Sequence, residues 1–143
     1  MMNILFMCVA NSARSQLAEG IAKQIFEVNA DIRSAGSQPT KVNPFAVRAL
    51  DEVGAKTESL FSKNIDDLPK VFLDELDYVI TLCAEEVCPI FISKAKKLHW
   101  PLPDPAGHEG TDEEQLNRFR LTRDDIHKRL KSFSKDLANA KKG

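Results

Sequence analysis

The sequence lacks an excess of charge of either sign, a long hydrophobic run and a recognisable targeting segment. Its formal net charge is −1, so electrostatics favour neither nucleic acid nor an acidic membrane surface as a partner. No apolar run approaches the roughly 18 residues of a membrane-spanning helix. The first residues show no basic region followed by a cleavage pattern, which a secretory signal would have. These absences predict a cytoplasmic protein that binds neither nucleic acid nor membrane.

Cysteine is also scarce, with three residues at Cys8, Cys83 and Cys88. A secreted disulfide scaffold would carry more cysteines, in even number. The close Cys-x2-Cys pair of common structural zinc sites is missing, so we expect no metal centre. An odd set of cysteines in a chain of this kind indicates reactive thiols. The alternative for each cysteine is a small buried hydrophobic residue.

The patterns that are present indicate one α/β domain over residues 1–143. Hydrophobic residues make up 43% of the chain and charged residues 29%, which is ordinary for a globular protein. Short apolar runs predict strands at 3–7, 31–36, 78–82 and 97–100. Helical spacing follows 14 (apolar Leu17, Ile21, Ile25, Val28), 43 (Val47, Leu50, Val53) and 111, with short turns around Pro69. Asn43 before Pro44 is typical of an N-cap, and Thr111-Asp112-Glu113-Glu114 is typical of a capping box. We therefore expect an open, mostly parallel four-stranded sheet with helices on both faces and a ligand site beyond the strands' carboxyl ends.

The segment between the first strand and the first helix has the composition of an oxyanion-binding loop. Cys8 ends the strand, and Arg14 stands six residues later where the helix begins. The loop amides and the positive end of the helix dipole would converge on one point, where an arginine clamps a tetrahedral anion. The same field favours thiolate over thiol at the cysteine. The expected binding residues are Val9, Ala10, Asn11, Ser12, Ala13, Arg14 and Ser15.

The run from Cys8 to Gly20 resembles the phosphate-binding loop of the low-molecular-weight tyrosine phosphatase superfamily, and more narrowly that of the thioredoxin-coupled arsenate reductases. The phosphatase branch usually follows its Arg-Ser with Pro, where this chain has Gln16. The resemblance implies reduction of arsenate to arsenite, with phosphate or sulfate as competing oxyanions. It also implies a protein without a tightly bound cofactor that takes its electrons from thioredoxin, with glutaredoxin or a mycothiol-type thiol as the alternatives. We expect a monomer.

Asp104-Pro105 is the second part of the resemblance, which implies that Asp104 is the general acid on the leaving oxygen. Asp-Pro is also a common turn dipeptide, which is the alternative. The phosphatases usually place aromatic residues after this pair to wall a cleft for a phenyl ring. This chain has Ala106-Gly107-His108 there, which favours a small inorganic oxyanion.

Cys83 and Cys88 distinguish a reductase from a phosphatase, because a reductase must deliver two electrons. The resemblance implies that Cys83 attacks the Cys8 adduct, and that Cys88 then attacks Cys83 to leave a disulfide for thioredoxin. This chain has four residues between those two thiols, two fewer than the best-known three-cysteine reductases. Residues 83–88 would have to rearrange on oxidation. Otherwise Cys88 is structural, or an external thiol resolves the intermediate.

The resemblance also implies a set of residues that hold the oxyanion-binding loop in place. It would map potassium ligands of some relatives onto Asn11, Glu19 and Ser34, with Lys63 where those relatives carry an aspartate. The Lys63 ammonium would pair with Glu19 and make the ion unnecessary, or it is a solvated surface lysine. Two other functions stay open at this stage. One is a phosphatase that hydrolyses phosphomonoesters through a phosphocysteine, and the other is an oxyanion-binding or redox-sensing module without turnover.

Overall fold

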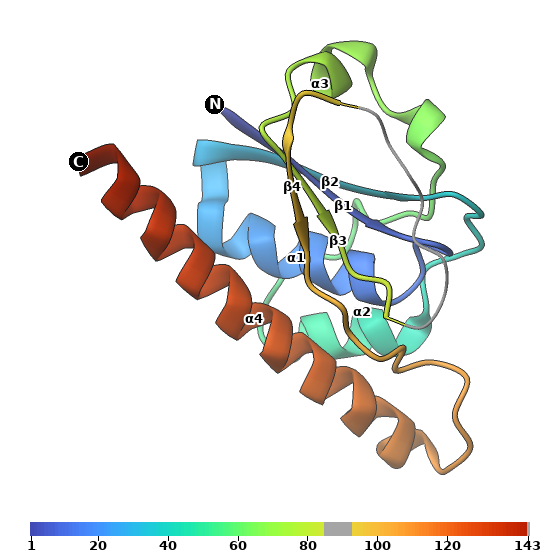
Figure 1. The fold of residues 1–143 in the computed structure, drawn as a ribbon. Coiled ribbons are helices and arrows are strands. Elements are labelled where there is room, and N and C mark those ends of the chain that lie inside the picture. The colour runs from blue at the N-terminus through green and yellow to red at the C-terminus, as the bar shows by residue number, and fades with distance from the viewer. Residues whose placement is uncertain (85–92, 143) are drawn as a thin grey trace.

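The computed structural model describes residues 1–84 and 93–142, and its centre is a parallel sheet (Figure 1). The strands are β1 (Met2–Cys8), β2 (Ala30–Gly36), β3 (Tyr78–Thr81) and β4 (Lys96–His99). They are ordered β2-β1-β3-β4, and every neighbouring pair is parallel. The predicted four-stranded sheet is confirmed. Because β1 lies between β2 and β3, its residues from Asn3 to Cys8 are all buried, as the continuous apolar run predicts.

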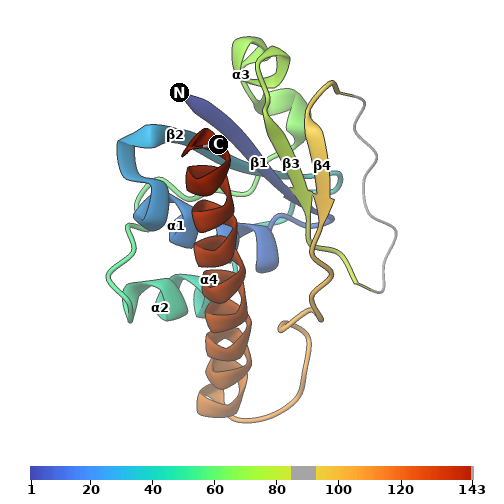
Figure 2. The same ribbon diagram turned by 60° about the vertical axis from the view of Figure 1, so that its left-hand side comes forward.

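Helices cover both faces of the sheet (Figures 1 and 2). One face packs against α1 (Arg14–Phe26), α2 (Pro44–Asp51) and α4 (Asp112–Lys142), and its core includes Ile4, Phe6, Ile80 and Leu82. The other face packs against η2 (Ile65–Asp67) and α3 (Lys70–Asp74), and its core includes Leu5, Met7, Val79 and Phe72. Successive residues of β1 therefore alternate between two separate cores, which is the two-residue period of a strand.

The helix ends follow the predicted capping residues, whereas two of the predicted apolar stripes run too far. Asn43 Oδ1 accepts a hydrogen bond from Phe45 N at 2.9 Å and caps α2. Thr111 and Glu114 form the expected reciprocal cap of α4. Val28 was expected on the buried face of the first helix, but α1 ends at Phe26 and Val28 is 83% exposed in the turn η1 (Glu27–Asn29). The buried face of α2 is formed by Ala46, Ala49 and Leu50, whereas Val53 lies beyond the end of the helix and is exposed.

Ion pairs join α4 to the end of α2. Arg120 and Arg123 of α4 both donate to the Glu52 carboxylate, and Arg123 Nη1 also donates to Ala49 O at 2.8 Å. The hydrogen bond from Arg120 is the largest cause that lowers the pKa of Glu52 from 4.5 to about 2. The carboxylate therefore stays ionised in moderate acid, and the two helices stay joined at this point.

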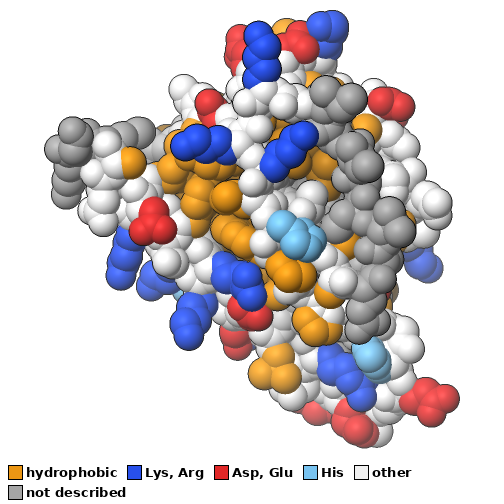
Figure 3. Space-filling model, in the orientation of Figure 1, with side chains coloured by type: hydrophobic (Ala, Val, Ile, Leu, Met, Phe, Trp, Pro, Cys, Tyr) orange, Lys and Arg blue, Asp and Glu red, His pale blue; other side chains and the backbone are white. Residues whose placement is uncertain are grey.

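Aromatic side chains pack α4 against β3 and the chain just after β4. Phe133 of α4 packs edge-on against Tyr78 of β3, at a centroid distance of 5.0 Å, and against Trp100 just beyond β4, at 5.8 Å. A pocket of about 530 Å³ lies here between β4 and α4, where hydrophobic side chains reach the surface (Figure 3). No helix in the described ranges is long and apolar enough to span a bilayer.

Candidate active site

Cys8 is the last residue of β1, and the loop that follows leads directly into α1. Its side chain is buried at 2% exposure, and Sγ lies 2.9 Å from Ser15 Oγ in the first turn of α1. Asn11 Nδ2 donates to the same hydroxyl oxygen at 2.7 Å. Because Ser15 Oγ accepts that bond, its own proton is available for the Cys8 sulfur. The local structure predicted for this segment, a strand, a loop and a helix, is confirmed.

Three carbonyl groups of the loop point outward, toward the 38–43 segment, and each accepts a hydrogen bond. Val9 O, Ala10 O and Ser12 O accept hydrogen bonds from Gln38 N, Thr40 N and Asn43 N at 2.9, 3.1 and 3.0 Å. Ser62 Oγ also donates to Ala10 O at 3.0 Å. In a trans peptide the N–H points opposite to the C=O. The amides that follow these carbonyls therefore point away from the 38–43 segment, which is the arrangement that an anion cradle requires.

Asn11 shapes the loop with both its backbone and its side chain. Its φ is +48°, a left-handed conformation that asparagine tolerates better than most residues. Its Oδ1 accepts from Lys63 N at 3.0 Å, and its Nδ2 donates to Ser34 Oγ at 3.0 Å as well as to Ser15. The side chain is fully buried. Asn11 thus ties the loop to β2, to the segment before η2 and to α1.

Gly36, at the end of β2, is the one glycine that the site requires for space. A Cβ at this position would lie 2.4 Å from Val9 O and 2.9 Å from Asn11 N. Both contacts are with backbone atoms, which cannot move aside without moving the loop. The Ser-Ala-Gly end of β2 therefore allows the loop to pack closely against the sheet.

Arg14 connects the loop to the Asp104 segment. The guanidinium belongs to a side chain that is 4% exposed, and Nη1 donates to Leu102 O at 3.0 Å. Nη2 lies 3.8 Å from Asp104 Oδ2, whose side chain is 48% exposed. Asp104 is therefore close to the cradle and open to solvent, the position that a proton donor to a bound oxyanion would occupy.

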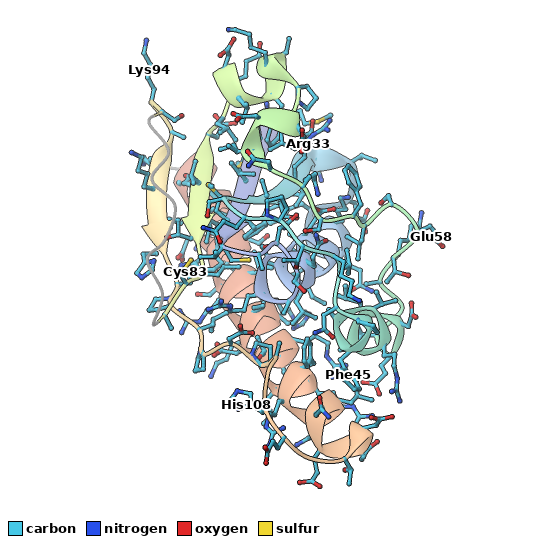
Figure 4. The ribbon with its side chains drawn as sticks, turned by 90° about the vertical axis from the view of Figure 1, so that its right-hand side faces the viewer. Arg33, Phe45, Glu58, Cys83, Lys94 and His108 are labelled. Carbon is cyan, nitrogen blue, oxygen red and sulfur yellow. The ribbon has the colours of Figure 1, made fainter. Side chains whose placement is uncertain are left out.

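A tight turn holds the backbone of Asp104. Its Oδ1 accepts from Ala106 N at 3.0 Å, and its carbonyl O lies 2.9 Å from His108 Nε2. Since a carbonyl only accepts, Nε2 of His108 carries the proton. Gly107, between them, has φ +78°. The residues after Asp-Pro thus form a compact turn, and Figure 4 shows His108 on the long loop before α4.

Cys83 lies two residues beyond β3, at the same edge of the sheet as Cys8. Leu82 N donates to Met7 O at 3.0 Å, so the chain before Cys83 stays paired with the end of β1. Cys83 is 1% exposed, and Figure 4 shows it at the carboxyl ends of the strands. The structure therefore brings Cys8, Cys83 and Asp104 to the carboxyl edge of the sheet, where a ligand site was expected. Cys88 lies outside the described residues.

Lys63 is buried, with 6% of its surface exposed, so it is not a solvated surface lysine. Its Nζ lies 3.6 Å from Glu19 Oε1, which also accepts from Ser34 Oγ at 2.6 Å. Burial lowers the pKa of Lys63 from its ordinary 10.5, and the Glu19 carboxylate partly offsets this. A potassium ion at this carboxylate would meet the ammonium charge, so these residues do not fit one. Within residues 1–84 and 93–142, no cluster of three or more His, Cys, Asp or Glu side chains could hold a metal.

Replacing Glu19 by glutamine is expected to destabilise the fold by about 3–5 kcal/mol, because it leaves the Lys63 ammonium buried without a counter-charge. Lys23→Gln is the matched control, since Lys23 contacts the same carboxylate at 2.7 Å but its side chain is 40% exposed. We expect that control to cost at most about 1 kcal/mol. Urea unfolding of the three proteins measures both values. Equal losses in the two variants would contradict the buried pair.

The residues that sequence reasoning missed act through contacts that are distant in the chain. Gln16 is fully buried, and its Nε2 donates to Asn11 O at 2.9 Å and to Phe61 O at 3.0 Å. Leu102 contributes only its carbonyl, to Arg14. One available signal was a polar Gln16 directly before Leu17, the first residue of the buried stripe of α1. Its partners could not be read from the sequence.

Comparison with known proteins places this geometry in a family. A profile of the family described as "Low molecular weight phosphotyrosine protein phosphatase" matches residues 3–142. An arsenate reductase of Halalkalibacterium halodurans is 44% identical over 133 residues, which are 92% of this chain and 94% of that protein.

Solved structures agree with this placement. The structure of an arsenate reductase in the phosphate binding state has a TM-score of 0.73 and 29% identity, over 93% of this chain and 96% of that one. A thioredoxin-dependent arsenate reductase of Corynebacterium glutamicum has a TM-score of 0.74 and 26% identity, over 98% of this chain and 63% of that one. The chain belongs to the low molecular weight phosphotyrosine protein phosphatase family, in the branch whose sequence relatives are arsenate reductases.

Proposed function

We propose that this protein reduces arsenate to arsenite, with Cys8 as the nucleophile. The observation that carries this proposal is the second buried thiol, Cys83, at the same edge of the sheet as Cys8. A phosphatase of this fold needs one thiolate and water, whereas a reductase needs a second thiol to complete a two-electron transfer. The arsenate reductases among the relatives support the same reaction.

The first step is attack by the Cys8 thiolate on arsenic(V). The amides after the outward-pointing carbonyls and the Arg14 guanidinium hold the oxygens, and the Ser15 hydroxyl stabilises the thiolate. A sulfur–arsenic bond forms and an arsenic–oxygen bond breaks. Asp104 donates its proton to the departing oxygen, which leaves as water.

The second step transfers the electrons. The Cys83 thiolate attacks the Cys8 sulfur, a disulfide forms, and the electron pair of the sulfur–arsenic bond stays on arsenic, which leaves as arsenite. The disulfide then needs two electrons from an external dithiol. Thioredoxin fits this role, since one relative is named as thioredoxin-dependent. Cys88 would pass the disulfide to the surface if residues 83–88 rearrange.

The test is arsenite production from arsenate with thioredoxin, thioredoxin reductase and NADPH. Wild type is expected to turn over many times, and Cys83→Ser to release no arsenite through its own disulfide, because the Cys8 adduct has no internal thiol to resolve it. Cys88→Ser decides whether the third thiol takes part. Hydrolysis of an aryl phosphate is the control for a folded site in all three proteins. Absence of arsenite from wild type, with equal aryl phosphate hydrolysis by every protein, would leave a phosphatase.

A further inference from the structure

We propose that Gln16 is a positioning residue that sets the direction of the Ser12 amide and couples oxyanion binding to the 61–63 segment. Gln16 lies in the first turn of α1 and is fully buried, and its Nε2 donates to Asn11 O and Phe61 O. It acts on two backbone carbonyls. This inference rests on the proposed oxyanion site but not on reduction or turnover.

The first bond fixes a strained peptide. Gln16 Nε2 donates to Asn11 O at 2.9 Å, and Asn11 has the left-handed φ of +48°. In the trans peptide from Asn11 to Ser12, the N–H of Ser12 points opposite to that carbonyl. Holding Asn11 O against Gln16 therefore turns the Ser12 N–H away from Gln16, the direction that a donor of the cradle requires. Without this bond, the peptide can rotate and withdraw one donor from the cradle.

The second bond connects the loop to a distant segment. The same Nε2 donates to Phe61 O at 3.0 Å, and Lys63 Nζ donates to that carbonyl at 2.9 Å. Two further bonds, from Ser62 Oγ to Ala10 O and from Lys63 N to Asn11 Oδ1, join the same two segments. The 61–63 segment and the loop are therefore braced side by side, and a change in one is transmitted to the other.

The oxygen atom of the Gln16 carboxamide indicates that the two hydrogen bonds of Nε2 serve the site more than the stability of the fold. Gln16 Oε1 is buried, and within the described part of the chain it has no hydrogen-bond partner. A buried acceptor without a donor is destabilising. Turning the amide over would place Oε1 against two carbonyl oxygens, so the orientation is fixed by its donors. A residue that costs stability at one end and orients the cradle at the other is typical of functional sites.

The test is the dissociation constant of inorganic phosphate, measured by calorimetry for wild type, Gln16→Met and Gln24→Met. Gln24 is the matched control, because it lies on the same helix and its Nε2 donates to Val53 O at 2.8 Å, away from the loop. We expect Gln16→Met to bind phosphate about tenfold more weakly, which corresponds to one hydrogen bond. Its thermal midpoint should change little, because the substitution removes the unpaired Gln16 Oε1 together with the donor to Asn11 O. Gln24→Met should bind phosphate normally. Equal affinity of wild type and Gln16→Met would overturn the proposal, as would an equal loss in both variants.

Proton exchange in the wild-type protein tests the same role of Gln16 even if Gln16→Met does not fold. The carboxamide protons of Gln16 should exchange with solvent more slowly than those of Gln24, and phosphate should slow them further. If phosphate does not change the exchange rate of the Gln16 carboxamide protons, the proposed coupling to oxyanion binding is overturned. Failure of wild type to bind phosphate at all would instead contradict the oxyanion site itself, so the two failures are distinguishable.

Discussion

Replacing Cys8 by serine is expected to abolish arsenate reduction, with kcat lower by a factor of roughly 10⁴ or more. A serine hydroxyl is not ionised at neutral pH, and it cannot form the disulfide that carries away two electrons. The loss should therefore exceed that of any substitution that only misplaces a group. Arsenite formation in single-turnover and steady-state assays measures it.

The Cys8→Ser protein should still bind phosphate with an affinity close to that of wild type. The hydrogen bonds that hold the loop carbonyls and the Asn11 side chain do not involve the cysteine sulfur. The sulfur contacts only Ser15 Oγ among the hydrogen bonds described above. Phosphate binding is thus the control for a folded cradle. Undiminished arsenite production by Cys8→Ser would move the nucleophile to another thiol and would contradict the mechanism proposed above.

Replacing Arg14 by lysine is the second large effect, with kcat/KM for arsenate expected to fall by roughly 10²–10³. The arginine holds Leu102 O with Nη1 while Nη2 lies 3.8 Å from Asp104 Oδ2. A lysine has one nitrogen and cannot hold this carbonyl, face the acid and clamp two oxygens of an anion together. Both binding and proton transfer should therefore suffer.

Arg123→Lys is the matched control for Arg14→Lys. Arg123 is also a mostly buried arginine, and its Nη1 donates to a backbone carbonyl, Ala49 O, at 2.8 Å. Arg123 belongs to α4, and its side chain contacts Ala49 of α2 and Glu52, so replacing it should lower stability without lowering kcat/KM. Steady-state kinetics together with urea unfolding separates the two effects. If kcat/KM falls by the same factor in both variants, the role of Arg14 in holding the anion and facing Asp104 is wrong.

Local patterns in the sequence were sufficient for most of the elements. The continuous apolar run of β1 predicts a buried strand, and Asn43-Pro44 and Thr111 with Glu114 predict the starts of two helices. Each of these signals acts between residues within a few positions of one another, so it does not depend on the rest of the fold. The apolar spacing was misleading where a helix ends before the spacing does. Val28 continues the helical spacing but lies beyond the end of α1, and it is exposed.

The sequence by itself determined the chemistry at each position, namely a thiol at a strand end, an arginine where a helix begins and an aspartate in a proline-rich loop. Only the tertiary structure decided which of these groups meet. Arg14 reaches Leu102 O across 88 positions, and Lys63 reaches Glu19 and Asn11 from a segment that shows no helical or strand pattern. The strand order β2-β1-β3-β4 brings these segments to one edge. Contacts of this kind depend on how distant segments pack, which no local periodicity encodes.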